Sequence, residues 1–363
     1  MKCNVLLLLL LIPFLAIAGP KGEEVKKTIN REFNIQSNGH LGIENKYGDL
    51  DIAIGEPNKI KFNITITSKA GSEKKAQEAL DRVKVSFNEG FNRVDAKTDI
   101  ESSSSWLSWF GSSNQELRID YQVLVPKDVY LELNNKYGSI FLESSDRDAT
   151  VDIAYGDIRL GDINANLKLD MSYSDGSMSQ IKQGDLVLRY SNLEMENSQS
   201  LTVDMQYAEL VMGSSVGMHL VSSYSNVKGV DVDEVNYSGK YDDVYFDRVK
   251  KIDADCGYTG IELNGLAQSG EFDMRYGDLK ISNISNGFTR LGVTTSYTGV
   301  EFEFDSNASF SLDAQTNYCD ISHSDMKISE SIERDASNTL KASRGSGGGQ
   351  VIARMNYGGL TIN

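Results

Sequence analysis

The chain has 363 residues, and its 52 acidic residues outnumber its 36 basic residues, which gives a formal net charge of −16. Nucleic acids and anionic membrane surfaces repel such an excess, so we expect no nucleic acid as a partner. Beyond the first residues no stretch approaches the roughly 18 apolar residues of a membrane helix, so no transmembrane segment is expected. The acidity favours the solubility of a long β-protein, with binding of calcium or of a basic partner as the alternative.

Residues 1–18 have the pattern of a secretory signal peptide. Lys2 supplies the positive charge, residues 6–12 form an unbroken apolar run, and Ala16-Ile17-Ala18 is a small-residue cleavage site. We therefore expect cleavage after about Ala18 and export of the mature chain to the periplasm or the cell surface. No cysteine stands directly after that point, where a bacterial lipid anchor would need one, so the mature protein is expected to be soluble.

Residues 19–130 are predicted to hold one tyrosine-marked unit, Tyr47-Gly48-Asp49, and a capping insertion. Residues 59–69 alternate as a strand, and residues 83–87 and 94–100 are expected to form a hairpin around residues 88–90. Residues 116–125 alternate as a further strand. Between them Ser72 is placed to cap a helix, whose apolar face has four members: Ala76, Ala79, Leu80 and Val83.

Both tryptophans of the chain lie in a serine-framed segment at residues 101–113. Hydrophobic residues in a polar loop can mark a binding surface. The candidates for such a partner-binding tip are Trp106, Leu107, Trp109 and Phe110. The alternative, which we favour, is that they fold back and plug the end of the fold.

Residues 131–323 are organised by a tyrosine that recurs mostly every 17 or 18 residues, with two later spacings of 21. A fixed period of this kind is typical of solenoids. Including the outlying copies at Tyr47 and Tyr357, the repeat takes up thirteen of the seventeen tyrosines. Its main members are Tyr137, Tyr155, Tyr173, Tyr190, Tyr207, Tyr224, Tyr241, Tyr258, Tyr276, Tyr297 and Tyr318.

The residues on either side of each tyrosine alternate between apolar and polar, as in Leu186 and Leu188 before Tyr190, and this period of two marks strands with one buried face. The two residues after each tyrosine are small or turn-forming, so we expect them to take the left-handed backbone of a corner. Because each unit returns to the same edge, consecutive copies should be parallel. The predicted fold is an all-β, single-stranded parallel β-helix or solenoid with rungs of 17–18 residues, with a right-handed path expected.

Stacked one rung apart, the tyrosines would lie about 4.8 Å from one another. Our interpretation is a structural ladder that fixes the register and closes one edge of the core. The alternative is an exposed aromatic stripe that binds sugar rings.

The last part of the chain, residues 324–363, departs from the repeat, and two cysteines lie within the repeat. Residues 324–363 lose the repeat and are predicted to form a glycine-rich loop and a terminal rung. Cys256 and Cys319 fall three or more rungs apart, too far for a disulfide, so two buried, unpaired thiols are expected.

The sequence carries no recognised catalytic motif, so we assign no catalytic residue, no metal ligand and no cofactor. His323 stands where other rungs have an inward apolar residue and is expected to be a core or edge residue rather than a base. Five corner aspartates could bind calcium as a stack, but the paired glycines of calcium-binding rolls are missing. They are Asp157, Asp175, Asp243, Asp278 and Asp320.

With these units laid out, the chain resembles the family of bacterial β-solenoid domains named putative adhesins. The resemblance rests on tyrosine–glycine–aspartate–aliphatic units, such as residues 155–158 and 276–279, and on the early strand, charged helix and hairpin of residues 60–100. It covers nearly the whole mature chain. It implies adhesion and a Gram-negative envelope location, and it offers no catalytic residues.

Together these features predict an exported, non-enzymatic, adhesin-like structural or binding module, whose partner is a protein or a glycan of the cell envelope. The alternative is a carbohydrate-active β-helix enzyme, a polysaccharide lyase or hydrolase. Rungs this short leave little chain for the long loops from which such enzymes build a groove.

Overall fold

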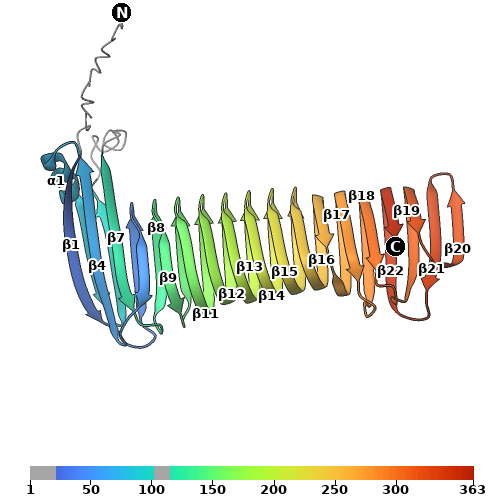
Figure 1. Cartoon of the computed structure of the whole chain (residues 1–363), viewed down its shortest axis with the longest axis horizontal. Coiled ribbons are helices and arrows are strands. Elements are labelled where there is room, and N and C mark those ends of the chain that lie inside the picture. Colours follow the sequence, from blue (N-terminus) through green and yellow to red (C-terminus); the bar gives the residue numbers. More distant parts are fainter. Residues whose placement is uncertain (1–21, 102–114) are drawn as a thin grey trace, which may run out of the picture.

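The computed structural model describes residues 22–101 and 115–363, which form one elongated rod of stacked strands (Figure 1). Most neighbouring rungs pair in parallel with offsets of 17 or 18 residues, as in the pairing of Leu160 with Met178 and of Met178 with Met195. The predicted parallel β-solenoid is therefore confirmed. Within the described ranges no helix has the length and apolar character needed to cross a membrane.

As far as residue 240 the solenoid body is built from strands that lie between successive tyrosine corners, whereas its last four strands each continue through a repeat tyrosine. In the units up to Tyr241 one strand ends before the tyrosine and another begins after it, and from Asp157 onward that second strand continues through the return turn into the following unit. The strands of the body are β8 (Tyr130–Lys136), β9 (Ile140–Ser145), β10 (Ala149–Ala154), β11 (Asp157–Ser172), β12 (Asp175–Arg189), β13 (Asn192–Gln206), β14 (Glu209–Ser223), β15 (Asn226–Lys240), β16 (Asp243–Leu263), β17 (Leu266–Ile284), β18 (Arg290–Phe304) and β19 (Phe310–His323).

The core is a narrow column between the two strand faces of each rung. Because side chains alternate along a strand, every second residue points inward and lies in register with its counterparts above and below. One inward column, buried throughout, consists of Val151, Leu169, Leu186, Val203, Leu220, Tyr237, Ala254, Phe272 and Val293. Each fully buried aliphatic or aromatic side chain of this kind stabilises the fold by roughly 1.5–3 kcal/mol.

The N-terminal end of the rod is formed by residues 22–101 and 115–125, which we call the cap. Three long strands of it are antiparallel: β4 (Lys59–Ala70) lies between β1 (Glu23–Asn34) and β7 (Glu116–Val125). The first rung is formed by β2 (His40–Lys46) and β3 (Leu50–Ile54), and its tyrosine stacks directly on Tyr137. Since β3 pairs in parallel with both β7 and β9, the cap continues the sheet of the body.

The cap also contains the predicted helix and hairpin. Helix α1 (Glu73–Asp81) starts at Ser72, whose hydroxyl accepts a hydrogen bond from the Lys75 N–H, and it buries Ala76, Ala79 and Leu80. Val83 belongs instead to β5 (Val83–Gly90), which pairs antiparallel with β6 (Arg93–Ile100). The hairpin turn lies at residues 91–92, later than predicted, because Asn92 is the residue that takes the left-handed backbone.

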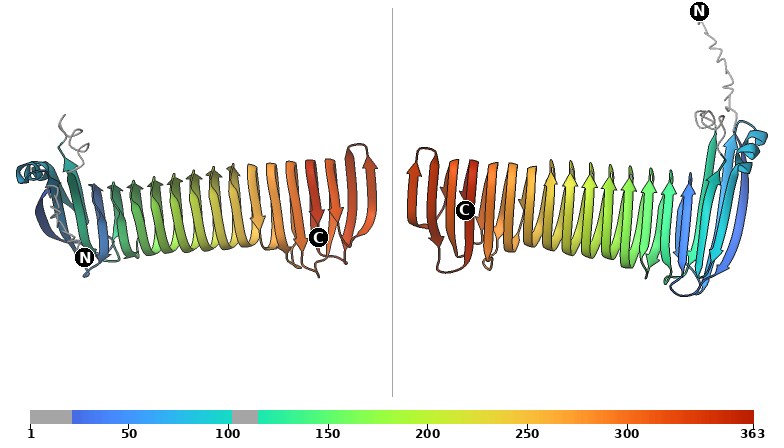
Figure 2. Two further views of the ribbon diagram at one scale, coloured as in Figure 1. Left: turned by 45° about the horizontal axis from the view of Figure 1, so that its top comes forward. Right: turned by 180° about the vertical axis from the view of Figure 1, so that it is seen from behind.

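The C-terminal end differs from the predicted order. The last strand, β22 (Gly349–Ile362), does not follow β19 but inserts between β18 and β19 and pairs in parallel with both. The chain before it is a hairpin of β20 (Lys327–Arg334) and β21 (Ser337–Arg344), which extends the sheet beyond β19 in antiparallel fashion (Figure 2).

Glycines make this insertion possible. Gly345, Gly347 and Gly348 all have positive φ, and a Cβ on Gly348 would lie 1.8 Å from the Ser309 carbonyl oxygen. The glycine-rich stretch is thus a tight turn that brings the chain back beside β19, and not the longer loop from residue 324 that the sequence predicted.

Candidate functional site

The tyrosine row is the most regular feature of the surface. All thirteen repeat tyrosines have left-handed backbone, with φ from 51° to 63°. We expected the small residues after each tyrosine to take this conformation, and that expectation is wrong. A left-handed L-residue costs roughly 1–2 kcal/mol, which ring stacking with two neighbours offsets.

The rings form one continuous stack from Tyr47 to Tyr318, with Tyr357 between Tyr297 and Tyr318. Centroid separations run from 4.7 to 5.2 Å and interplanar angles from 1° to 16°. The rings lie outside the core, and along the stack from Tyr137 they are 43–62% exposed. Because neighbours cover the ring faces, the row presents ring edges and hydroxyls, so a sugar cannot stack on a ring face inside it.

Behind the tyrosines runs a column of small residues that sets how closely the rungs approach. At Gly138 and Gly156 an added Cβ would lie 2.0 and 2.1 Å from the carbonyl oxygen of the preceding rung. In other rungs a buried hydroxyl takes this place. Ser191 accepts a hydrogen bond from the Ser174 N–H and donates to the Arg189 carbonyl, and Ser225 is bonded in the same way.

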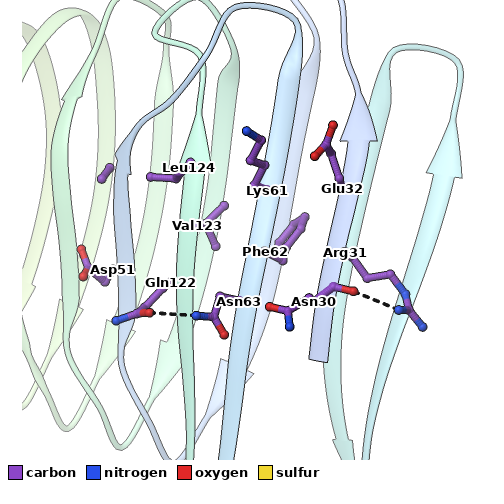
Figure 3. A pocket seen from close by; sticks show the side chains of 11 residues that line it. Asn30, Arg31, Glu32, Asp51, Lys61, Phe62, Asn63, Gln122, Val123 and Leu124 are labelled. Carbon is purple, nitrogen blue, oxygen red and sulfur yellow. Dashed lines mark hydrogen bonds between the residues drawn. The ribbon is translucent and has the colours of Figure 1, made fainter. Parts of the chain in front are cut away.

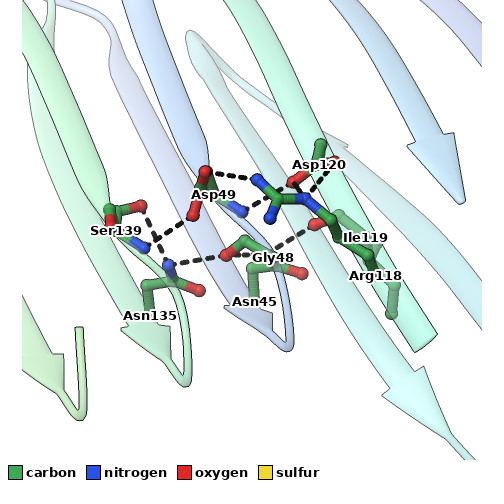
Figure 4. Close-up of polar contacts among 8 residues, drawn as sticks. All are labelled: Asn45, Gly48, Asp49, Arg118, Ile119, Asp120, Asn135 and Ser139. Atoms are coloured by element: carbon green, nitrogen blue, oxygen red, sulfur yellow. Dashed lines mark hydrogen bonds and ion pairs between the residues drawn. The ribbon is translucent and has the colours of Figure 1, made fainter. Parts of the chain in front are cut away.

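The corner of the first rung ties the cap to the body (Figure 4). The side-chain amide of Asn135 donates to the Gly48 carbonyl at 2.9 Å, and the Asp49 carboxylate accepts from the Ser139 N–H at 2.8 Å. Arg118 of β7 forms ion pairs with Asp49 and Asp120. The Asp49 carboxylate is therefore engaged by the backbone and by Arg118 of its own corner. In the part of the chain that the structure describes, no cluster of three His, Cys, Asp or Glu is placed to bind a metal.

A buried acid stands in the middle of the rod. Asp242 occupies the small-residue column, where its carboxylate accepts hydrogen bonds from Ser222 and Tyr237 at 2.7 and 2.8 Å and from the Ser225 N–H at 2.8 Å. Burial raises the pKa of Asp242, and the bonds from Ser222, Tyr237 and Ser225 oppose that shift. Burial and the nearby carboxylate also raise the pKa of the Tyr237 hydroxyl. These groups face one another and not the solvent, so the cluster is structural.

The two cysteines lie in the core, and two of the histidines lie near the two ends of the rod. Cys256 and Cys319 are buried and unpaired, and burial raises the pKa of Cys256 to about 12. His40 stacks on Tyr130 with ring centroids 4.8 Å apart. His323 is exposed at the end of β19, the last strand of its face. The predicted tip, Trp106, Leu107, Trp109 and Phe110, lies outside the described residues.

A long trough crosses the outer face of the strands that follow the tyrosines. Two hollows, of about 610 Å³ over the cap and about 950 Å³ over the body, share Asp51 and Ala53 and so join into one feature. The trough runs along the rod axis from β1 and β4, over β7, β3 and β9, to Val230 of β15. We call it the axial trough.

The floor of its cap end is a row of polar side chains from four strands (Figure 3). Strand pairing sets Asn30 opposite Asn63, Asn63 opposite Gln122, and Gln122 opposite Asp51. The Asn63 amide donates to the Gln122 amide oxygen at 3.3 Å, and all four side chains are exposed. A second row beside it contains Glu32, Lys61 and Leu124.

Sequence reasoning missed the axial trough. Its four-residue row is spread over residues 30–122, and each member occupies an ordinary outward position of an alternating strand. Only the strand order brings the four together. The one available signal was that Asn30, Asn63 and Gln122 are uncharged amides at outward strand positions, where Lys and Glu are usual.

The sequence matches no protein-family model and no curated protein. Among solved structures the chain is similar to a putative cell adhesion protein from Clostridium sporogenes, with 8% identity over 93% of this chain and 99% of that one and a TM-score of 0.16. It is also similar to putative adhesins from Parabacteroides distasonis (10% identity; 76% of this chain and 93% of that one; TM-score 0.30) and Parabacteroides merdae (10%; 76% and 92%; 0.29). The names of these solved structures agree with the family that the sequence resembles.

Proposed function

We propose that the chain is an exported, non-enzymatic, adhesin-like binding module that presents a rigid rod to another component of the bacterial envelope. The observation that carries this proposal is the axial trough. It extends over both cap and body, and its floor and sides are side chains of hydrogen-bonded strands. Such a surface is pre-formed, so binding costs little ordering of the protein.

The shape of the trough also favours binding over catalysis. An enzyme needs catalytic groups that converge on one reacting atom in a concave site. Here the functional groups lie on an open strand face, in rows set by the register. Export is supported by the signal-like pattern of residues 1–18.

The test is binding by the purified mature chain, residues 19–363, immobilised and exposed to solubilised envelope. We expect saturable retention of an envelope component, which the double variant Arg159→Glu/Glu194→Arg, reversing two exposed charges of the axial trough, should weaken. A matched variant on the opposite strand face, Lys168→Glu/Asp185→Lys, should bind as the wild type does. Turnover of a polysaccharide by the purified chain would overturn the proposal in favour of a lyase or hydrolase.

Localisation has its own test. Fractionation of cells that express the full chain should place it outside the inner membrane, shortened at about Ala18. Deletion of residues 2–18 should keep it in the cytoplasm. Recovery of the full-length chain in the cytoplasm would contradict export.

A further inference from the structure

The side chains that line the axial trough restrict the chemical class of ligand that it can bind. This inference rests on the proposed function of the chain as a binding module. Its cap end offers three carboxamides and a carboxylate in one line, from Asn30, Asn63, Gln122 and Asp51 (Figure 3). A carboxamide both donates and accepts, and a carboxylate accepts through two oxygens. A line of such groups is suited to a ligand that has donors and acceptors at every step of its length.

Apolar side chains accompany the polar row. Leu124 is 42% exposed beside it, and further along the trough Val211 and Val230 are 36% and 44% exposed. Phe141 is half-buried in the same column as Asp51, with the Arg159 guanidinium 5.9 Å from its ring centroid. The ligand must therefore have apolar patches between its polar groups.

The charges of the trough exclude acidic ligands. Its lining includes five carboxylates, Glu32, Asp51, Glu143, Glu194 and Glu196, and three cations, Arg31, Lys61 and Arg159. The carboxylates exceed the cations, and the whole chain adds a net charge of −16. Phosphate backbones and uronate-rich polymers would meet repulsion at close range.

Strand pairing excludes an added peptide strand. β4, β7, β3 and β9 are each hydrogen-bonded on both sides, so no peptide strand can add to them. β1 pairs only with β4, and a strand added at its outer edge would run parallel or antiparallel to β1 beside the trough, not along the rod axis over the polar row. An amphipathic helix would need a continuous apolar groove, and the polar row interrupts any such groove.

We propose that the axial trough binds an uncharged, extended polysaccharide lying along the rod axis. Hydroxyl groups of successive sugars meet the amides and the carboxylate, and the C–H faces of the rings lie on the exposed Leu124, Val211 and Val230 side chains and on the half-buried Phe141 ring. Because the trough crosses successive strands about 4.8 Å apart, a longer ligand contacts more strands, so affinity grows with the length of the ligand.

The test uses affinity electrophoresis of residues 19–363 in gels that contain soluble neutral polysaccharides, with a polyuronate gel in parallel. We expect retardation by at least one neutral polymer, none by the polyuronate, and at least a tenfold loss of affinity in Asn63→Ala/Gln122→Ala. The matched control is Asn236→Ala, an exposed amide on the face that precedes the tyrosines. Each variant is first shown by circular dichroism to melt as the wild type does, and Asp51→Ala replaces the double variant if the latter is unstable.

The proposal of an uncharged polysaccharide would be overturned if no neutral polymer retarded the chain. It would also be overturned if Asn236→Ala lost as much affinity as Asn63→Ala/Gln122→Ala, or if polyuronate retarded the chain as strongly as a neutral polymer. Failure of this inference can be told from failure of the proposed function. If envelope retention persists after glycosidase treatment of the extract and is abolished by protease, the partner is a protein and only the ligand class is wrong. If nothing is retained before either treatment, the binding module itself is wrong.

Discussion

At the scale of single residues, the tyrosine corner combines an unfavourable backbone with a favourable contact. Tyr207 has a φ of 51°, and its ring stacks on Tyr190 at 5.0 Å and on Tyr224 at 4.9 Å. The backbone cost and the stacking gain are of similar size. Tyrosine is therefore retained at the corner by its neighbours, since it is not a residue that prefers this conformation by itself.

Two substitutions separate the cost of the left-handed backbone from the gain of ring stacking. Tyr207→Ala should lower the unfolding free energy by about 1–3 kcal/mol, because two stacked pairs are lost while the left-handed backbone remains. Tyr207→Gly loses the same contacts but relieves the backbone, so it should be the more stable of the two variants. Urea denaturation of both checks this; a glycine variant less stable than the alanine variant would contradict it.

The two thiols should be protected by the fold. Burial raises the pKa of Cys256 to about 12 and also raises that of Cys319, so little thiolate exists at pH 8. We expect a maleimide reagent to label neither residue in the native chain and both after denaturation. Rapid labelling of Cys256 in native buffer would contradict the register that buries it.

At the scale of the rung, the close approach of backbones at the corner explains why small residues follow the tyrosines. Gly156→Ala would place a methyl group 2.1 Å from the Gly138 carbonyl oxygen. Relief of that clash requires the rungs to separate, so we expect a loss of about 1–3 kcal/mol of unfolding free energy. Thermal melting is the measurement. Ser174→Ala, at the same position one rung later, is the control and should cost less.

Asp242 makes the stability of its rungs depend on pH. Because burial raises its folded pKa above the unfolded value of about 3.9, the folded chain binds this proton more tightly. The contribution of Asp242 to the unfolding free energy is therefore most favourable at a pH below the unfolded pKa. It falls as pH rises through the folded pKa.

Asp242→Asn removes this titration. Urea denaturation between pH 4 and 8 should show the variant gaining stability relative to the wild type as pH rises. The exposed neighbour Asp243 offers the control, since Asp243→Asn should follow the wild-type curve. If the unfolding free energies of the wild type and Asp242→Asn changed with pH by the same amount, the Asp242 carboxyl would have the same pKa in the folded and unfolded states, which would contradict this prediction.

At the scale of the whole molecule, the inserted strand β22 links the C-terminal rungs. It forms parallel ladders with β18 on one side and β19 on the other, and Tyr357 completes the ring stack between their tyrosines. The last strand in sequence is therefore not the last in space. Its removal should affect its neighbours on both sides.

Truncation after residue 348 tests this arrangement. Without β22 the segment from β19 to β21 loses its parallel neighbour, so limited proteolysis should cut within residues 305–348 and leave a resistant fragment ending near Phe304. Had β22 simply stacked on the end, its loss would leave residues 310–344 protected. A chain truncated after residue 304 is the control and should show the same resistant fragment without further cuts.

The sequence by itself determined the repeat, its strands and their parallel stacking, because these depend on alternation and spacing that are local and recur many times. Tyr155 and Tyr173 need only be counted to predict that they stack. Tertiary structure alone decided where β22 lies and how Asn30, Asn63, Gln122 and Asp51 form one row. Pairing between segments distant in the chain depends on which strand edges are free once the rungs have formed, and a periodic pattern carries no information about that choice.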